Sequence, residues 1–138
     1  MQEGQRQALH AVGALAVAGR RGHILLVDDE ALVTEVGREM LTDLGYEVTA
    51  CTSGAQALEV FRRTPHAFVL AIVDYALPDL SGAALAQALR QLRPHLPLIL
   101  CTSQVQTHAQ AHALGFDALL RKPFRLEHLA LTLDVVLA

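Results

Sequence analysis

Residues 67–73 form an unbroken run of seven apolar residues, Ala-Phe-Val-Leu-Ala-Ile-Val, which ends in a single carboxylate at Asp74. A run of this length, with β-branched members and without polar residues at alternate positions, is typical of a strand covered on both faces of a parallel sheet. Residues 75–82 have the composition of a loop that leads into a helix. We therefore expect Asp74 at the carboxyl edge of a central strand, where open α/β sheets carry their functional groups.

Other strand patterns lie on both sides of this run, at about residues 24–27, 46–50, 97–102 and 117–121. The second of these alternates apolar and polar residues, as an edge strand with one wetter face does. Helical patterns fill the intervals between them. Five strand–helix repeats at roughly even spacing predict a doubly wound α/β fold with helices on both faces of a five-stranded parallel sheet.

The helical patterns are defined by apolar residues at helical spacing and by capping residues. The Ser53–Gln56 capping-box pattern opens a helix that ends near Arg63, before Pro65, and an Ala-rich helix is predicted over residues 104–114. The apolar faces of the other three helices are predicted to be Val33, Val36, Met40 and Leu44 before Gly45; Leu85, Leu89 and Leu92 before Pro94; and Leu126, Leu129, Leu133 and Val136.

Composition restricts the kind of protein. We interpret residues 1–22, rich in Gln, Ala and Gly, as an extension or linker, and residues 23–138 as one domain large enough to bury a core. Apolar residues make up 52% of the chain and charged residues 18%, which is typical of an ordered soluble protein. The net charge of −3 gives no general attraction to nucleic acid or acidic membranes, and no apolar run is long enough to insert into a membrane. Cys51 and Cys101 form no CxxC pair, which favours a reducing, cytoplasmic location.

Polar side chains end four of the five predicted strands, namely Asp28 and Asp29, Asp74, Thr102 and Lys122. If the first and third strands are neighbours, the three acids share a pocket and repel one another unless a cation joins them. Oxygen ligands with room left for water suit Mg²⁺ better than zinc. A carboxylate beside Mg²⁺, an ammonium group and a hydroxyl can receive a phosphoryl group. The alternative, at any single strand end, is a helix cap or a solvated side chain.

These residues resemble the receiver domain of two-component response regulators over residues 23–138. The resemblance rests on four fragments: Ile-Leu-Leu-Val-Asp-Asp-Glu (24–30), Asp-Tyr-Ala-Leu-Pro-Asp-Leu-Ser-Gly (74–82), Leu-Cys-Thr-Ser (100–103) and Lys-Pro-Phe (122–124). Each fragment alone is weak, but all four in this order and at these spacings are highly specific. The resemblance implies a flavodoxin-like sheet with strand order 2-1-3-4-5, which places the first and third strands side by side.

The resemblance also implies how the phosphoryl group is handled. Asp74 accepts it from a histidine kinase or a histidine phosphotransfer protein, while Thr102 and Lys122 contact it. The Lys122–Pro123 bond is compatible with cis geometry. The expected function is a phosphorylation-controlled switch that catalyses only its own phosphorylation and dephosphorylation, acts as a monomer or weak dimer, and has a downstream partner that the sequence does not identify.

The Mg²⁺ ligands are implied in the same way. Asp29, Asp74 and the backbone carbonyl of Ala76 bind the ion, and Asp28 contributes through metal-bound water. Softer similarities of residues 38–46 and 98–102 suggest the receiver of a hybrid histidine kinase, so a stand-alone protein and a piece of a larger kinase both stay open.

Departures from the family pattern keep alternatives open. Leu119 stands where receivers usually carry Tyr or Phe, which leaves a degenerate receiver that binds partners without phosphorylation as one alternative. An aspartyl-phosphate phosphatase is another, although Ala76 stands where such enzymes often have a second acid. A nucleotide-binding flavodoxin-like protein is disfavoured, because no Gly-rich loop follows the first strand. His108 and His112 have a metal-binding spacing but no third ligand nearby, so we do not predict a metal there.

Overall fold

The computed structural model describes residues 21–104 and 107–138. Of the predicted extension, residues 1–22, all but the last two lie outside the described residues. From His23 onward the chain alternates strictly between strands and helices, as predicted. The elements are β1 (His23–Val27), α2 (Ala31–Asp43), β2 (Glu47–Cys51), α3 (Gly54–Arg63), β3 (Phe68–Asp74), α4 (Gly82–Leu92), β4 (Leu98–Thr102), α5 (His108–Ala113), β5 (Ala118–Arg121) and α6 (Leu126–Val136).

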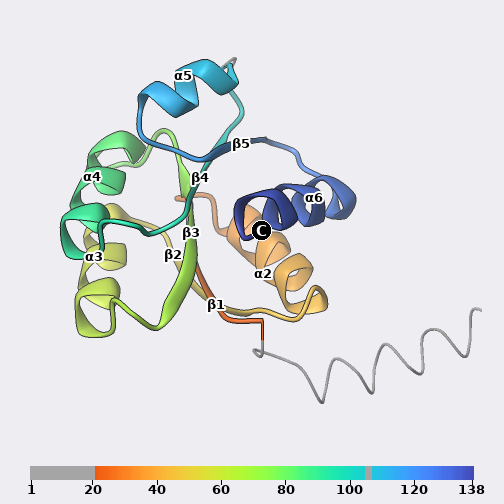
Figure 1. Ribbon diagram of the computed structural model, residues 1–138, viewed down its shortest axis with the longest axis horizontal. Coiled ribbons are helices and arrows are strands. Elements are labelled where there is room, and N and C mark those ends of the chain that lie inside the picture. The colour runs from red at the N-terminus through yellow and green to blue at the C-terminus, as the bar shows by residue number, and fades with distance from the viewer. Residues whose placement is uncertain (1–20, 105–106) are drawn as a thin grey trace, which may run out of the picture.

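The five strands form one parallel sheet in the order β2-β1-β3-β4-β5, which confirms the predicted topology. Figure 1 shows α3 and α4 on one side of the sheet and α2 and α6 on the other. Strand β3 lies at the centre and pairs with both β1 and β4. The carboxyl ends of β1 and β3 are therefore adjacent, at the position where the strand order reverses and where such sheets bind ligands.

A hydrophobic core covers each face of the sheet, which explains why β3 has no polar residues at alternate positions before Asp74. Ala71 and Val73 belong to the core under α3, α4 and α5, whereas Leu70 and Ile72 belong to the core under α2 and α6. Because successive side chains of a strand point to opposite faces, a strand buried on both faces must be apolar throughout. The prediction from residues 67–73 is confirmed.

The buried face of α2 differs from the predicted one. Thr34, Gly37 and Leu41 are the buried residues of this helix, whereas Val36 is 41% exposed. A Cβ at position 37 would lie 2.9 Å from Cδ2 of Leu26, so the glycine marks the line along which the helix contacts the sheet. A pattern that counts only large apolar residues misses this contact, and the prediction for Val36 was wrong.

The ends of two other predicted faces also reach solvent. Leu92, the last residue of α4, and Leu126, the first of α6, are 39% and 37% exposed. Helix α5 begins at His108, later than predicted, because Thr107 forms its capping box with Gln110; residues 105 and 106 of the predicted helix lie outside the described part of the chain.

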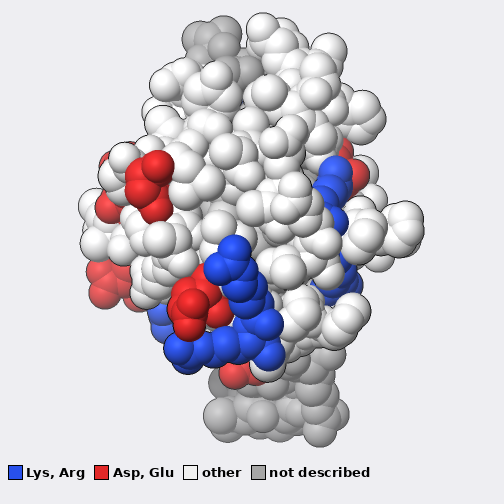
Figure 2. Space-filling model, turned by 90° about the vertical axis from the view of Figure 1, so that its left-hand side faces the viewer, with Lys and Arg blue, Asp and Glu red and all other residues white. Residues whose placement is uncertain are grey.

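The surface over α3 and α4 carries both signs of charge. In Figure 2, basic and acidic side chains gather together toward one end of this face, and most of it is uncharged. One exposed ion pair there joins Arg63 and Glu59 of α3 at 3.0 Å, a kind of pair that adds little stability. Among the described residues, no helix is both long and apolar enough to cross a bilayer.

Candidate functional site

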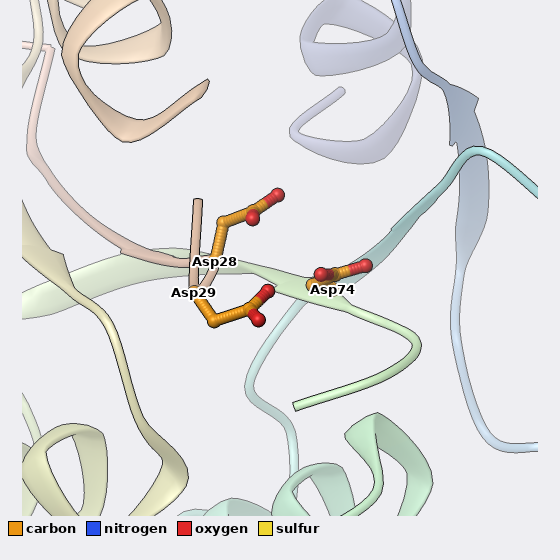
Figure 3. A group of neighbouring side chains, drawn as sticks. All are labelled: Asp28, Asp29 and Asp74. Carbon is orange, nitrogen blue, oxygen red and sulfur yellow. The ribbon is translucent and has the colours of Figure 1, made fainter. Parts of the chain in front are cut away.

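Three acids meet at the carboxyl edge of the sheet. Asp28 and Asp29 directly follow β1, and Asp74 is the last residue of β3. Val27 is the register partner of Val73, so the residues after them are neighbours. One carboxylate oxygen from each acid lies within 4.8 Å of the others, and Figure 3 shows the three side chains gathered beyond the two strand ends. The predicted acidic pocket is confirmed.

Lys122 joins this group from the loop after β5. Its Nζ lies 2.8 Å from Oδ2 of Asp28, 3.4 Å from Oδ2 of Asp74 and 3.5 Å from Oε1 of Glu30. The side chains of Lys122, Asp28 and Asp74 are all nearly buried, at 9%, 2% and 8% exposure. Burial opposes the charge on the lysine, but its hydrogen bond to Asp28 and the attraction of Asp28 and Asp74 raise the pKa of its ammonium group above the usual value.

The pKa of the Asp74 carboxyl is raised to about 6, principally because burial disfavours its charged form and secondarily because Asp28 repels it. The attraction of Lys122 and hydrogen bonds from Lys122 and from the backbone N–H of Ala76 offset part of this rise. The buried pocket thus disfavours the ionised form of Asp74 more than bulk solvent does.

Thr102 lies on the same edge, at the end of β4, and is buried. Its hydroxyl accepts a hydrogen bond from the N–H of Gln104 at 3.0 Å. The backbone N–H of Lys122 donates to the carbonyl of Thr102 at 2.9 Å, so the two residues are held together through the main chain. Among the described residues, no hydrogen bond joins the Thr102 hydroxyl to Asp74. The acids and the lysine are therefore in contact with one another, and Thr102 lies beside them.

The loop between β3 and α4 folds tightly against Asp74. Ala76 forms an antiparallel bridge with Ser81, and the N–H of Gly82 donates to the carbonyl of Tyr75 at 2.8 Å. A Cβ at position 82 would lie 2.2 Å from the backbone oxygen of Asp74, so only glycine permits this close approach. The loop keeps Ala76 next to the acidic pocket.

Glu30 also contacts Lys122, and this contact was not predicted from the sequence. It directly follows Asp28 and Asp29 in the chain, and its backbone N–H donates to Oδ1 of Asp28 at 2.9 Å. This bond folds the acids back toward the sheet and brings the Glu30 side chain to Lys122. The run of three consecutive acids was the available signal.

The donor set of the pocket fits a hard divalent cation. Carboxylate oxygens of Asp28, Asp29 and Asp74 converge, whereas nitrogen or sulfur ligands do not take part, and this favours Mg²⁺ or Ca²⁺ over zinc. In the described part of the chain these acids are the only such group of three. His108 and His112 are not part of this group.

One further expectation, the geometry of the peptide bond before Pro123, is confirmed. The Lys122–Pro123 bond is cis. Cys101 is buried in the core under α2 and α6. Leu119 is buried in the opposite core, 2% exposed.

The family model of the response regulator receiver domain matches residues 24–134. The chain belongs to this family. A response regulator SaeR of Staphylococcus epidermidis is 30% identical over 118 residues, which are 84% of this chain and 50% of that protein. A probable transcriptional regulator ycf27 of Cyanidium caldarium is 32% identical over 120 residues, which are 86% of this chain and 47% of that protein. The receiver thus spans about half the length of these curated relatives.

Solved structures of receivers have the same fold. The chemotaxis protein CheY4 of Vibrio cholerae superposes with a TM-score of 0.76 at 28% identity, over 83% of this chain and 98% of that one. The non-phosphorylated HemR receiver domain of Leptospira biflexa gives a TM-score of 0.75 at 29% identity, over 85% and 94% of the two chains. The flavodoxin-like receiver fold implied by the sequence is confirmed.

Proposed function

We propose that this receiver is the phosphoacceptor of a two-component or phosphorelay system, in which Asp74 takes a phosphoryl group from the phosphohistidine of a histidine kinase or phosphotransfer protein. The observation that carries the proposal is the placement of Lys122 Nζ between Asp74, at 3.4 Å, and Asp28, at 2.8 Å, beside Asp29. A carboxylate oxygen of Asp74 attacks phosphorus, an O–P bond forms, the P–N bond breaks, and the donor histidine leaves as imidazole.

Mg²⁺ is the cation that we propose for the acidic pocket. Asp29, Asp74 and the backbone carbonyl of Ala76 would hold it, with Asp28 acting through bound water. When bound, Mg²⁺ neutralises charge on the phosphoryl oxygens, as it does in other phosphoryl transfers. The Lys122 ammonium, whose Nζ lies 3.4 Å from Oδ2 of Asp74, contributes a second positive charge.

The switch in this proposal depends on Thr102. Its hydroxyl, which accepts the N–H of Gln104, donates its own hydrogen to an oxygen of the phosphoryl group, and Lys122 contacts the same group. Contacts made only in the phosphorylated state shift a pre-existing equilibrium toward the active arrangement. The protein then catalyses its own phosphorylation and dephosphorylation and no other reaction.

The donor docks, in this proposal, in a groove of about 450 Å³ that opens beside the site between α2 and the loop after β5. Its lining is apolar except for Glu30, Ser103 and Lys122, and includes Val33, Val36, Pro123 and Phe124. Leu32, on the rim, is 72% exposed. An apolar groove next to the nucleophile suits the helix of a phosphotransfer protein. We place this reaction in the cytoplasm, since Cys51 and Cys101 are unpaired and buried.

The test is incubation with acetyl phosphate and Mg²⁺, followed by intact mass. We expect the wild type to gain one phosphoryl group and Asp74→Ala to gain none. Asp43→Asn, an exposed acid at the end of α2, is the matched control and should behave as the wild type. Unmodified wild-type protein, or modification that survives in Asp74→Ala, would refute the proposal.

A further inference from the structure

The loop between β3 and α4 is fastened to the start of α3 by Asp79. Oδ1 of Asp79 accepts the N–H of Gly54 at 2.9 Å, and Oδ2 accepts the N–H of Ala55 at 2.8 Å. These bonds hold the pKa of the Asp79 carboxyl below its usual range. Helix α3 has no acidic residue in its own first turn, so Asp79 supplies both the acceptors and the negative charge that a helix N-terminus favours.

Leu80 adds an apolar contact at the same helix end. A Cβ at Gly54 would lie 1.9 Å from Cδ2 of Leu80, so the leucine occupies the space that the glycine leaves free. Leu80 is partly buried against the core under α3 and α4. The tip of the loop is therefore held at two adjacent points, one polar and one apolar.

The base of the loop connects this anchor to the phosphoacceptor. Only a few residues separate Asp79 from the bridge between Ala76 and Ser81. The N–H of Ala76 hydrogen-bonds the carboxylate of Asp74 and lowers its pKa. Only residues 77–80 lie between the two bridged positions, so the bonds of Asp79 restrain the same short loop that carries Ala76.

We propose that Asp79 is a positioning residue: by fixing the loop on α3, it holds Ala76 against Asp74 and thereby sets the Mg²⁺ affinity of the pocket and the rate of phosphorylation. The effects on Mg²⁺ and phosphorylation rest on the proposed function, whereas the placement of Ala76 does not. Loss of outer groups that orient metal ligands commonly weakens metal binding about tenfold or more.

The test compares Asp79→Ala with Ser53→Ala, a matched control at the same helix end. Ser53 accepts the N–H of Gln56 at 3.1 Å and does not hold the loop. Amide hydrogen exchange at Ala76 is measured by NMR without divalent cation, followed by Mg²⁺ titration and acetyl phosphate kinetics at several Mg²⁺ concentrations. We expect Asp79→Ala to speed exchange at Ala76, weaken Mg²⁺ binding about tenfold and slow phosphorylation most at low Mg²⁺, while Ser53→Ala changes none of these.

Two more variants keep the test decisive if Asp79→Ala unfolds. Asp79→Asn retains one acceptor oxygen and should give an intermediate effect, and Leu80→Ala removes the apolar half of the anchor and should act in the same direction. Equal Ala76 exchange and equal Mg²⁺ affinity in the Asp79 and Ser53 variants would overturn the inference. Faster exchange and weaker Mg²⁺ binding in Asp79→Ala, with a wild type that never becomes phosphorylated, would support the positioning role and refute the proposed function instead.

Discussion

Replacing Asp74 with asparagine should stabilise the protein at neutral pH when no divalent cation is present. Burial and the repulsion of Asp28 raise the pKa of the Asp74 carboxyl from 3.8 to about 6, so its ionisation opposes folding. At about 1.4 kcal/mol per pH unit, this difference corresponds to about 3 kcal/mol of lost stability above the folded pKa. Asparagine resembles the uncharged acid in shape, and we expect Asp74→Asn to increase the free energy of unfolding by about 2 to 3 kcal/mol.

The stability gained by Asp74→Asn should depend on pH. An acid whose pKa is higher in the folded state binds more protons there than in the unfolded chain, so its contribution to stability falls as pH rises from 3.8 to about 6. The advantage of Asp74→Asn should thus be small near pH 4 and complete above pH 6.

Urea unfolding followed by circular dichroism, in EDTA at about pH 4 and about pH 7.5, measures both ends of this window. Asp43→Asn is again the control, because Asp43 is exposed and lies away from the pocket. An equal advantage at both pH values, or none at about pH 7.5, would show that the folded protein does not raise the pKa of Asp74.

Three further changes test the surroundings of Asp74. Lys122→Met removes an attraction that lowers the Asp74 pKa, so the carboxyl should titrate above pH 6 in ¹³C NMR; an unchanged or lower value would contradict the contact. Gly82→Ala places a Cβ 2.2 Å from the backbone oxygen of Asp74 and should destabilise the protein by about 1 to 3 kcal/mol in urea unfolding and impair phosphorylation by acetyl phosphate. Leu32→Gln should slow phosphoryl transfer from a phosphorylated phosphotransfer domain but not from acetyl phosphate. The control is Leu131→Gln, because Leu131 is 64% exposed on α6. Equal slowing in both variants would contradict docking of the donor in the groove.

Much of the site could be predicted because it depends on strand ends. The apolar run before Asp74 identifies a strand buried on both faces, and in a parallel sheet the carboxyl ends of all strands share one edge. The residue after each strand therefore reaches that edge wherever the strand lies. The order of the strands came from the resemblance to receivers, since periodicity alone does not say which strands are neighbours.

The helix faces were harder to predict because contacts there depend on shape as well as hydrophobicity. Gly37 lies where α2 comes closest to the sheet, with Leu26 beneath it, yet glycine carries no weight in an apolar pattern. Val36 satisfies the pattern and is 41% exposed. In this receiver Val36 lines the groove beside the site. The residue that was wrongly predicted to be buried therefore belongs to a surface that we assign to partner binding.

The anchor formed by Asp79 could not be read from the chain, because Asp79 and the N–H groups that it accepts are brought together only by the fold. The charge balance of the pocket has the same origin: the carboxylates of Asp28, Asp29, Glu30 and Asp74 gather around one ammonium group, while burial, and secondarily the repulsion of Asp28, raises the pKa of Asp74. A pocket built in this way favours any change that adds positive charge or removes a negative one. Protonation, a divalent cation and the Asp74→Asn substitution should therefore each stabilise the fold, and the stabilisation by the cation should be largest where Asp74 is ionised.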